Sequence, residues 1–463
     1  MTHKILTSFF VLALAVTTSS AKVTTLSGVE SSYAGKQLKL NTKLDEIVGL
    51  EHTLAECSVD EKGFFSFVVD IDAPIQAFIP TEGFNGYIFL EPGVNYQVNI
   101  PIYTERTLAQ KLDPYYKPTD ILLEIIGMKQ DDFNYKLMQF EDAFDFYSMK
   151  HVMYGSQVDS ILVSIQQMRD IFPDFNQDSF LNSYMENRFL LLLNSSQQVY
   201  QDSIISRLNH LGAQPSNPAF WDIFNNVFDD FIPQTAYDRQ QYLAFQRVIE
   251  EGNVKMYFML ITKRYGITDR SLRELVAIKW LSDLLNQNQF DQFKVLDLLQ
   301  KIGAGISDDR NRAILTEILN SASSIIIGEK IPDFEIISLE GKKKKISDFI
   351  GEYIYLNFEN SSIDQTQKDL DVLTRFQSDY KNNLTIVNVG LYDTKELVGR
   401  LAQRYPKMSF FYSEDSDSLR KLYHLSSIPH FFLIDKDGKF LMTKGAEPSD
   451  ELRMLLQHIF KSN

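Results

Sequence analysis

The pattern of hydrophobic and polar residues divides the chain into three stretches with different periods. Between residues 23 and 127, short runs of alternating apolar and polar residues, such as GFFSFVVDI and NYQVNIPIY, are separated by Gly, Pro, Asp and Asn. This alternation predicts β-strands with one buried face, and the sequences DEKG and EPG predict tight turns. The spacing favours an antiparallel β-sandwich, whose last strand we expect at TDILLEIIG.

From about residue 131 the apolar residues recur every three or four positions, beginning with DDFNYKLMQFEDAFDFY. This period predicts amphipathic helices, and similar patterns continue to about Ser324 with breaks at Pro and Gly. The two tryptophans, Trp221 and Trp280, lie on these helical patterns and are expected in the core.

From Gly328 onwards, strand-like runs alternate with helical runs. Strands are expected at EYIYLNF, LTIVNVGLY, SFFYS, HFFLIDK and KFLMTKG, with helices beginning at Asp364, Thr394, Ser416 and Asp450. This alternation predicts an α/β domain with a partly parallel sheet. The basic run Lys342 to Lys345 lies between two strand-like stretches, and we interpret it as a solvated edge that discourages pairing with other strands.

A chain of 463 residues exceeds what one hydrophobic core normally serves, so several domains are expected. We predict a multidomain α+β protein. Its parts are a signal peptide (1–21), an antiparallel β-sandwich (22–128), an all-helical domain (129–325) and an α/β domain (326–463).

The first residues have the order basic, apolar, small: Lys4, then ILTSFFVLALAV, then TTSSA. The apolar run is too short to span a bilayer, and the order is that of a secretory signal peptide with cleavage before Lys22. No cysteine follows the run, so no lipoprotein anchor is expected, and no later segment predicts a membrane span. We therefore expect a soluble, exported protein.

The formal net charge of −15 argues against partners that are nucleic acids or anionic membranes, which need a basic surface. Cys57 is the only cysteine, which excludes an intrachain disulfide, a CxxC pair and a multi-cysteine metal site. It stands in a strand-like run, where a small buried hydrophobe is expected. The histidines are scattered and no phosphate-binding loop is present, so we predict neither metal nor cofactor.

Several motifs in the last third of the chain resemble the thioredoxin-like family, in particular its exported TlpA and alkyl-hydroperoxide-reductase branch. GEKIPDFEI is similar to the entry strand of that branch, YIYLNF to its central strand, and SIPHFFLIDKDGKF to the cis-proline loop and the following hairpin. The resemblance covers residues 326–461 and implies a thioredoxin-like fold. DEKGFFSFVVDI and IFLEPGVNYQVNIP likewise resemble the β-domain that precedes such domains in exported proteins of Gram-negative bacteria.

The resemblance also implies where catalytic cysteines would stand. Alignment on the LNF motif places Ile363 and Thr366 at the two cysteine positions, with Asp364 and Gln365 between them and Glu359 where a Trp is common. Neither a branched hydrocarbon nor a hydroxyl can exchange disulfides. We therefore expect a degenerate redox loop and no catalytic residue.

Without the two cysteines, binding is the function that the resemblance still implies. In the family, the cis-proline loop beside a bare backbone edge holds extended peptides through strand-like hydrogen bonds. The resemblance carries this role over to Ile428, Pro429 and His430, with Glu359 nearby; alternatively, Pro429 only shapes the loop. We predict a non-catalytic periplasmic binding or scaffold protein that docks an extended peptide or partner protein of the cell envelope.

The sequence is also compatible with other functions. Ser361, Ser362, Asp364 and Thr366 are first expected to cap the following helix, although Ser362 or Thr366 with His430 could form a hydrolytic pair. A redox enzyme would have to work through Cys57 or a partner's thiol. Finally, exposed aromatic residues on the sandwich could capture carbohydrate or peptide ligands of the envelope.

Overall fold

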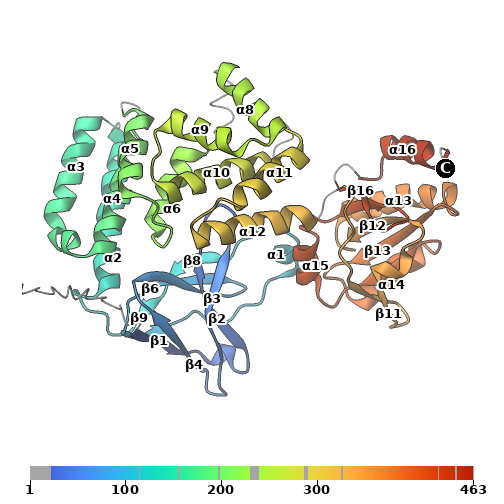
Figure 1. Cartoon of the computed structure of the whole chain (residues 1–463). Helices are drawn as coiled ribbons and strands as arrows, with labels where there is room; N and C mark the ends of the chain where they lie inside the picture. Colours follow the sequence, from blue (N-terminus) through green and yellow to red (C-terminus); the bar gives the residue numbers. More distant parts are fainter. Residues whose placement is uncertain are drawn as a thin grey trace, which may run out of the picture.

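The protein is described by a computed structural model that covers residues 22–113, 115–154, 157–196, 199–229, 239–285, 290–324, 327–425, 427–443 and 446–461. The predicted signal peptide lies outside these residues. Figure 1 shows a β-domain, a helical region packed above it, and a separate α/β domain that the segment after α12 joins to the rest. The expected multidomain α+β architecture is confirmed.

The β-domain consists of two sheets that enclose one apolar core. The first has the order β4 (Phe64–Ile71), β1 (Lys22–Val29), β7 (Asn95–Asn99) and β9 (Glu124–Ile125). The second has the order β3 (Glu51–Ser58), β2 (Gln37–Lys43), β5 (Ile75–Pro80), β6 (Phe84–Leu90) and β8 (Thr119–Leu122). The predicted sandwich is present, and each sheet adds one parallel pair to its antiparallel pairs, β1 with β7 and β6 with β8.

The stretch TDILLEIIG is not one strand. It forms β8 and β9, which belong to different sheets, and the buried Leu123 lies between them. The chain therefore crosses from one layer of the sandwich to the other at Leu123, so that its apolar residues serve both sheets.

The helical region carries the largest apolar core of the described chain, and Trp221 and Trp280 are both buried in it, as expected. Asn134 at the start of α2 joins this region to the β-domain, because its side chain bonds both the N–H and the carbonyl of Phe89. The helices are α2 (Phe133–Tyr154), α3 (Val158–Ile171), α4 (Ser179–Asn194), α5 (Gln201–Leu211), α6 (Pro218–Phe228), α8 (Arg239–Glu251), α9 (Val254–Tyr265), α10 (Arg270–Leu285), α11 (Gln292–Gly303) and α12 (Asp309–Ser324).

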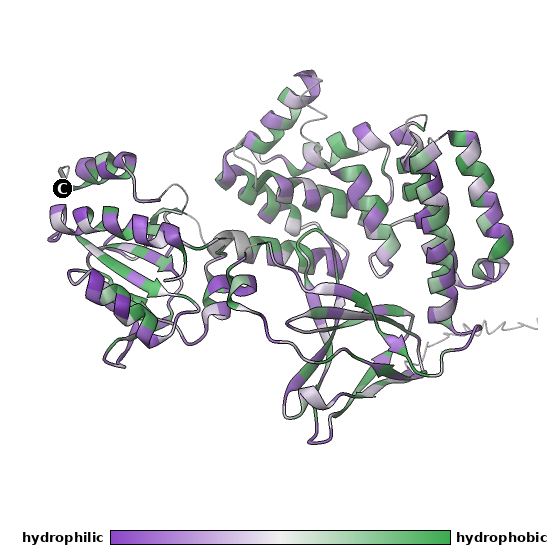
Figure 2. Ribbon diagram, turned by 180° about the vertical axis from the view of Figure 1, so that it is seen from behind, coloured by the Kyte–Doolittle hydropathy of each residue, from purple (hydrophilic) through white to green (hydrophobic). Residues whose placement is uncertain are grey.

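The α/β domain has a seven-stranded sheet. Its order is β11 (Lys343–Lys345), β10 (Glu335–Ser338), β14 (Ser409–Tyr412), β13 (Leu384–Gly390), β12 (Tyr353–Glu359), β15 (His430–Ile434) and β16 (Phe440–Met442). Strands β12, β13 and β14 are parallel and the other pairs antiparallel. The central strands are hydrophobic, whereas the helices around them carry hydrophilic residues (Figure 2). The lysine run forms the exposed edge strand β11, as predicted.

The two faces of this sheet bury different residues. Ile354, Leu356 and Phe358 of β12 pack with Leu419 of α15 (Ser416–Leu422). On the other face, Tyr355 packs with α13 (Asp364–Asp379), α14 (Lys395–Arg404) and α16 (Asp450–Lys461). Because side chains alternate along a strand, Asn357 and Glu359 also belong to this second face. Polar groups are thereby placed inside the layer next to α13.

Among the described residues, no helix has the length and apolar character needed to cross a membrane.

Candidate functional site

The loop that the sequence singles out lies at the carboxyl end of β12, between Glu359 and the start of α13 at Asp364. Strand β12 is central in the sheet: it pairs in parallel with β13 and antiparallel with β15. The β15 pairing brings His430 opposite Phe358, so the loop before His430 and the loop after Glu359 lie at the same end of the sheet. The structure thus places both predicted loops together.

Ile363 and Thr366 lie on the first turn of α13 with contrasting exposure. Ile363 is the N-cap residue and is half-buried, whereas Thr366 is only 1% exposed. The Thr366 hydroxyl has no hydrogen-bond partner among the described residues. Asp364 and Gln365 between them are exposed. One accessible position and one covered position therefore lie about a helical turn apart at the start of α13.

The predicted helix capping by serine or aspartate is wrong. The N-cap position belongs to Ile363, which has no oxygen to accept a bond from the free N–H groups. The nearby hydroxyls bond elsewhere: Ser361 Oγ donates to Asp393 Oδ1 at 2.7 Å, and Ser362 Oγ donates to Asn360 Oδ1. These side chains hold the loop itself rather than the helix.

Asp393, which follows β13, is the main anchor of the loop. Its Oδ2 accepts the backbone N–H of Ser361 at 2.8 Å, and its Oδ1 accepts the Asn360 side-chain amide at 3.2 Å. Asn360 also donates to the carbonyl of Leu391 at 2.7 Å. Burial raises the pKa of Asp393, although its hydrogen bonds from Ser361 oppose that rise. The loop is therefore fastened to the end of the neighbouring strand by polar contacts.

Glu359 is fully buried beneath this loop. Burial, and then the charges of Asp393 and Asp369, raise its pKa to about 8. Asn357 donates to its Oε2 at 3.2 Å, while its Oε1 has no hydrogen-bond partner among the described residues. A side chain without exposed surface cannot contact a docked peptide, so Glu359 supports the loop from below instead of offering a binding surface.

The opposite loop contains the Ile428–Pro429 peptide bond, which is cis. Ile428 is buried in the apolar core, while Pro429 and His430 keep part of their surface. The His430 ring packs on Phe432, with ring centroids 4.9 Å apart, and burial lowers the pKa of His430. The accessible part of this loop is therefore Ser427, Pro429 and His430.

The proposed hydrolytic pairing gains no support. The Ser362 hydroxyl is engaged by Asn360, and the buried Thr366 hydroxyl has no hydrogen-bonding base among the described residues. A serine or threonine nucleophile needs such a base within hydrogen-bond reach. The described residues also contain no group of three or more His, Cys, Asp and Glu side chains suited to hold a metal.

Cys57 lies far from this site in the fold, on the edge strand β3 of the β-domain. It is half-buried rather than fully buried, and it packs against the β-domain core. Burial raises the pKa of its thiol, which lowers the fraction of reactive thiolate. Nothing in this environment favours a redox role.

Sequence reasoning missed the polar network around the loop, although a signal was present. Asn357 and Asn388 each interrupt an otherwise apolar strand, in YLNF and IVNVG. They pair across β12 and β13, where the Asn357 amide donates to Asn388 Oδ1 at 3.0 Å. One asparagine in each of two apolar strand patterns could have indicated polar contacts near the loop that follows β12.

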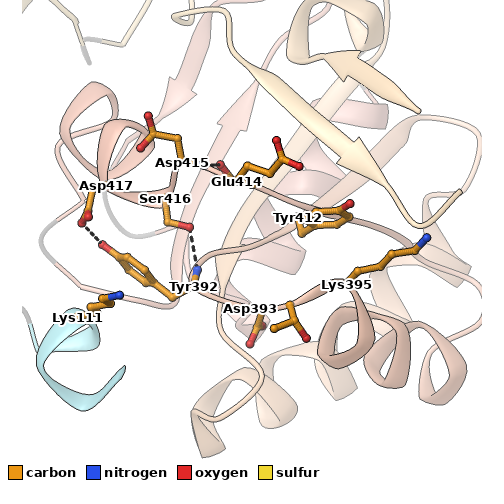
Figure 3. Close-up of a pocket in the computed structure, with 11 residues that line it drawn as sticks. Lys111, Tyr392, Asp393, Lys395, Tyr412, Glu414, Asp415, Ser416 and Asp417 are labelled. Atoms are coloured by element: carbon orange, nitrogen blue, oxygen red, sulfur yellow. Dashed lines mark hydrogen bonds between the residues drawn. The ribbon is translucent and has the colours of Figure 1, made fainter. Parts of the chain in front are cut away.

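A pocket of about 370 Å³ lies beside the site, at the carboxyl ends of β13 and β14. Residues 392–395 and 412–417 line it, together with Lys111 from α1 (Leu108–Leu112) of the N-terminal part (Figure 3). The site therefore adjoins a contact between distant parts of the chain.

Comparison with known proteins agrees with this architecture. The model of a family described as thioredoxin-like matches residues 351–440. The thiol-disulfide oxidoreductase ResA of Bacillus thuringiensis is 28% identical over 135 residues, which cover 29% of this chain and 78% of ResA. ResA of Geobacillus kaustophilus is 26% identical over 129 residues, 27% of this chain and 73% of the relative. The C-terminal region is thus a thioredoxin-like domain, homologous to ResA-type thiol-disulfide oxidoreductases.

Solved structures include similar chains. A thioredoxin-like protein from Bacteroides caccae is 15% identical, with a TM-score of 0.34, over 56% of this chain and 94% of its own. The thioredoxin domain of a thiol-disulfide oxidoreductase from Bacteroides vulgatus is 20% identical, with a TM-score of 0.28, over 29% of this chain and 99% of its own.

Proposed function

We propose that the C-terminal domain is a thioredoxin-like module that binds an extended peptide or partner protein without redox chemistry. The observation that carries this proposal is the pair Ile363 and Thr366 at the start of α13, where homologous oxidoreductases need thiols. The only sulfur nucleophile of the chain, Cys57, belongs to another domain. ResA-type relatives are named for an activity that these side chains cannot perform.

The proposed binding surface consists of the accessible residues at the end of the sheet where β12 ends and β15 begins. Ser427, Pro429 and His430 face this end from the β15 side, and Ile363, Asp364 and Gln365 face it from α13. An extended peptide can add to such an edge through main-chain hydrogen bonds, while shallow side-chain contacts select its sequence. The fixed loop anchored by Asp393 would reduce the ordering cost of binding.

The proposed place of action is the periplasm, supported by the basic, apolar and small order of residues 4–21. The proposed division into domains at residues 128–129 and 325–326 likewise stays a prediction. A protein partner fits the acidic charge of the chain better than a nucleic acid does.

Reduction of insulin by dithiothreitol tests the first part of the proposal, that the domain has no redox activity. The wild-type protein should remain at the background rate. The variant Ile363→Cys/Thr366→Cys should gain turnover, because both positions lie on the first turn of α13 with one accessible and one covered residue. Wild-type turnover clearly above background would contradict the proposal. No gain in the double variant would show that this loop is not a former redox loop.

Binding is tested by selecting phage-displayed linear peptides on the mature protein and measuring them against Ser427→Arg. Ser427 is exposed, so Arg should block the surface without disturbing the core, unlike a charge at the buried Ile428. An exposed substitution elsewhere in the same domain, Asp437→Arg, is the matched control. Peptides that lose at least tenfold affinity only for Ser427→Arg support the site. Equal binding to all three proteins, or no enrichment, contradicts it.

A further inference from the structure

The C-terminal half of α2 carries an apolar stripe on its outer face, which no part of the described chain covers. Four side chains form it, each with about two-thirds or more of its surface exposed: Phe146 (66%), Met149 (64%), Val152 (81%) and Met153 (66%). Their spacings of three and four residues place them on neighbouring turns of one helix face. The buried residues Phe140 and Phe144 lie on the other face, which packs on the helical core.

The packing of the single chain does not account for this stripe. A surface helix normally turns its apolar residues to the core and its polar residues to water. Single exposed apolar residues are ordinary, whereas a contiguous group of them marks an interaction surface. Figures 1 and 2 show α2 and α3 at the edge of the helical region that lies away from the thioredoxin-like domain. A partner can therefore approach the stripe without meeting another part of the protein.

The charges beside the stripe indicate which partner fits it. Asp142 and Lys150 are exposed, and among the described residues neither forms an ion pair. Lys150 lies only over the ring of Tyr147, with its Nζ 5.9 Å from the ring centroid. The two charged residues stand four positions before and four positions after Phe146, so the three form one row along the helix. A row with an acid at one end and a base at the other is complementary to a reversed copy of itself.

We propose that α2 pairs with α2 of a second copy of this chain, antiparallel and about a two-fold axis close to Phe146. The two Phe146 side chains then meet at the axis, and Asp142 of each copy faces Lys150 of the other. A parallel pairing would instead place Asp142 beside Asp142 and Lys150 beside Lys150, which like-charge repulsion disfavours. This inference does not depend on the proposed peptide-binding function.

The size of the stripe predicts a dimer of modest affinity. Four side chains from each copy would remove on the order of 1,000 Å² of surface in total, at the lower end of the range for specific interfaces. The two ion pairs at the rim contribute to the direction of pairing more than to affinity. Because the thioredoxin-like domain lies away from α2, the dimer leaves both candidate sites open (Figures 1 and 2).

Sedimentation velocity of the mature protein, over a hundredfold range of concentration, tests the dimer. We expect a concentration-dependent shift from monomer to dimer. Met149→Asp should weaken the association at least about tenfold, because it places a charge within the apolar contact. The matched control is Met454→Asp on α16, where the methionine is 63% exposed; this variant should associate like the wild type.

Reversal of charges tests the direction of pairing. Asp142→Lys alone and Lys150→Asp alone should each weaken the dimer, since each brings like charges together. The double variant Asp142→Lys/Lys150→Asp should regain the association of the wild type, because both ion pairs form again with reversed sign. All these side chains are exposed, so urea unfolding should confirm that the variants keep their fold. A double variant that stays as weak as the single variants overturns the antiparallel arrangement.

Two further results would overturn the inference as a whole. One is a protein that stays monomeric throughout the concentration range. The other is a dimer that Met149→Asp and Met454→Asp affect equally, because its interface then lies elsewhere. Flotation with vesicles of phosphatidylethanolamine and phosphatidylglycerol examines lipid as the other occupant of an apolar helix face. Monomeric protein that floats with these vesicles, and loses this binding in Met149→Asp, would show that the stripe contacts lipid and not a second copy.

Discussion

Two buried glutamates, Glu274 in the helical region and Glu359 beneath the candidate loop, have very different surroundings. Glu274 on α10 is 2% exposed and accepts hydrogen bonds from Arg270, from the N–H and hydroxyl of Ser307, from the N–H of Asp308 and from Asn311. Glu359 is fully buried and, among the described residues, accepts one bond, from Asn357, beside two other acids. The two residues differ in the number of their hydrogen-bond donors. The Glu274 carboxylate holds α10 to the start of α12, whereas the Glu359 carboxyl group is buried without enough donors to offset its loss of hydration.

The comparison predicts that removal of Glu274 has the larger effect. Glu274→Ala leaves the backbone amides of residues 307–308 without their acceptor and takes from the buried Asn311 amide its charged acceptor, so the free energy of unfolding should fall by about 4 kcal/mol. Urea unfolding followed by the fluorescence of Trp221 and Trp280 reports on this region.

The matched control is Glu250→Ala on α8, an exposed glutamate that accepts one bond, from Gln246. It should change the free energy of unfolding by less than about 0.5 kcal/mol. If Glu274→Ala were as mild as this control, its hydrogen bonds would not distinguish it from a surface carboxylate, and the comparison would fail.

Glu359 should instead make the thioredoxin-like domain sensitive to pH. Its pKa is raised from the ordinary value of 4.5 to about 8, so the folded state keeps a proton that the unfolded state releases between these values. Stability is therefore greatest below the ordinary pKa and is lost as the pH rises towards the folded-state pKa. We expect a loss of about 3 kcal/mol, as an order of magnitude, between about pH 5 and about pH 8.

The variant Glu359→Gln removes the titrating group while keeping its shape and its bond from Asn357. It should abolish most of this pH dependence and be more stable than the wild type at about pH 8. Pulse proteolysis in urea, with fragments of residues 327–461 assigned by mass spectrometry, measures the domain within the full chain. Equal pH slopes for the two proteins would show that Glu359 is ionised in the folded state.

The sequence predicts those elements whose apolar residues recur with a regular period. Periods of two and of three to four residues identified the strands of the sandwich, the helices from Phe133 and the α/β domain, because apolar residues there lie on one face. The stretch TDILLEIIG was mistaken for one strand, since both of its halves are apolar and only tertiary structure sends them to different sheets. Alternation reports burial of a side chain and not which sheet buries it.

The sequence predicted where the two loops lie in the fold, but not the polar contacts around them. The LNF motif located the loop before Ile363, and the SIPH motif located the loop with Pro429. The assignment of helix caps to the serines failed because Asp393, about thirty residues away in sequence, competes for the Ser361 hydroxyl. Long-range polar contacts of this kind leave no local period in the sequence, so the buried acid cluster emerged only from the structure.

The smallest expected effect concerns Asp393, and it links the loop to Glu359. Asp393→Asn keeps one oxygen that can accept a bond from Ser361. It replaces the other oxygen by an NH2 group, which cannot accept a bond, so the free energy of unfolding of the domain should fall by about 1 kcal/mol. Because the charge of Asp393 raises the pKa of Glu359, the variant should also move the pH-dependent loss of stability to lower pH and reduce its size.

Ser361→Ala provides the graded comparison, since it removes only the hydroxyl bond to Asp393 and leaves the charge in place. It should destabilise the domain by at most about 1 kcal/mol and leave the loss of stability towards pH 8 unchanged, because Asp393 still carries its charge there. Pulse proteolysis across the same pH range measures both variants. An unchanged pH profile in Asp393→Asn would mean that the two acids do not interact, and that burial alone sets the protonation of Glu359.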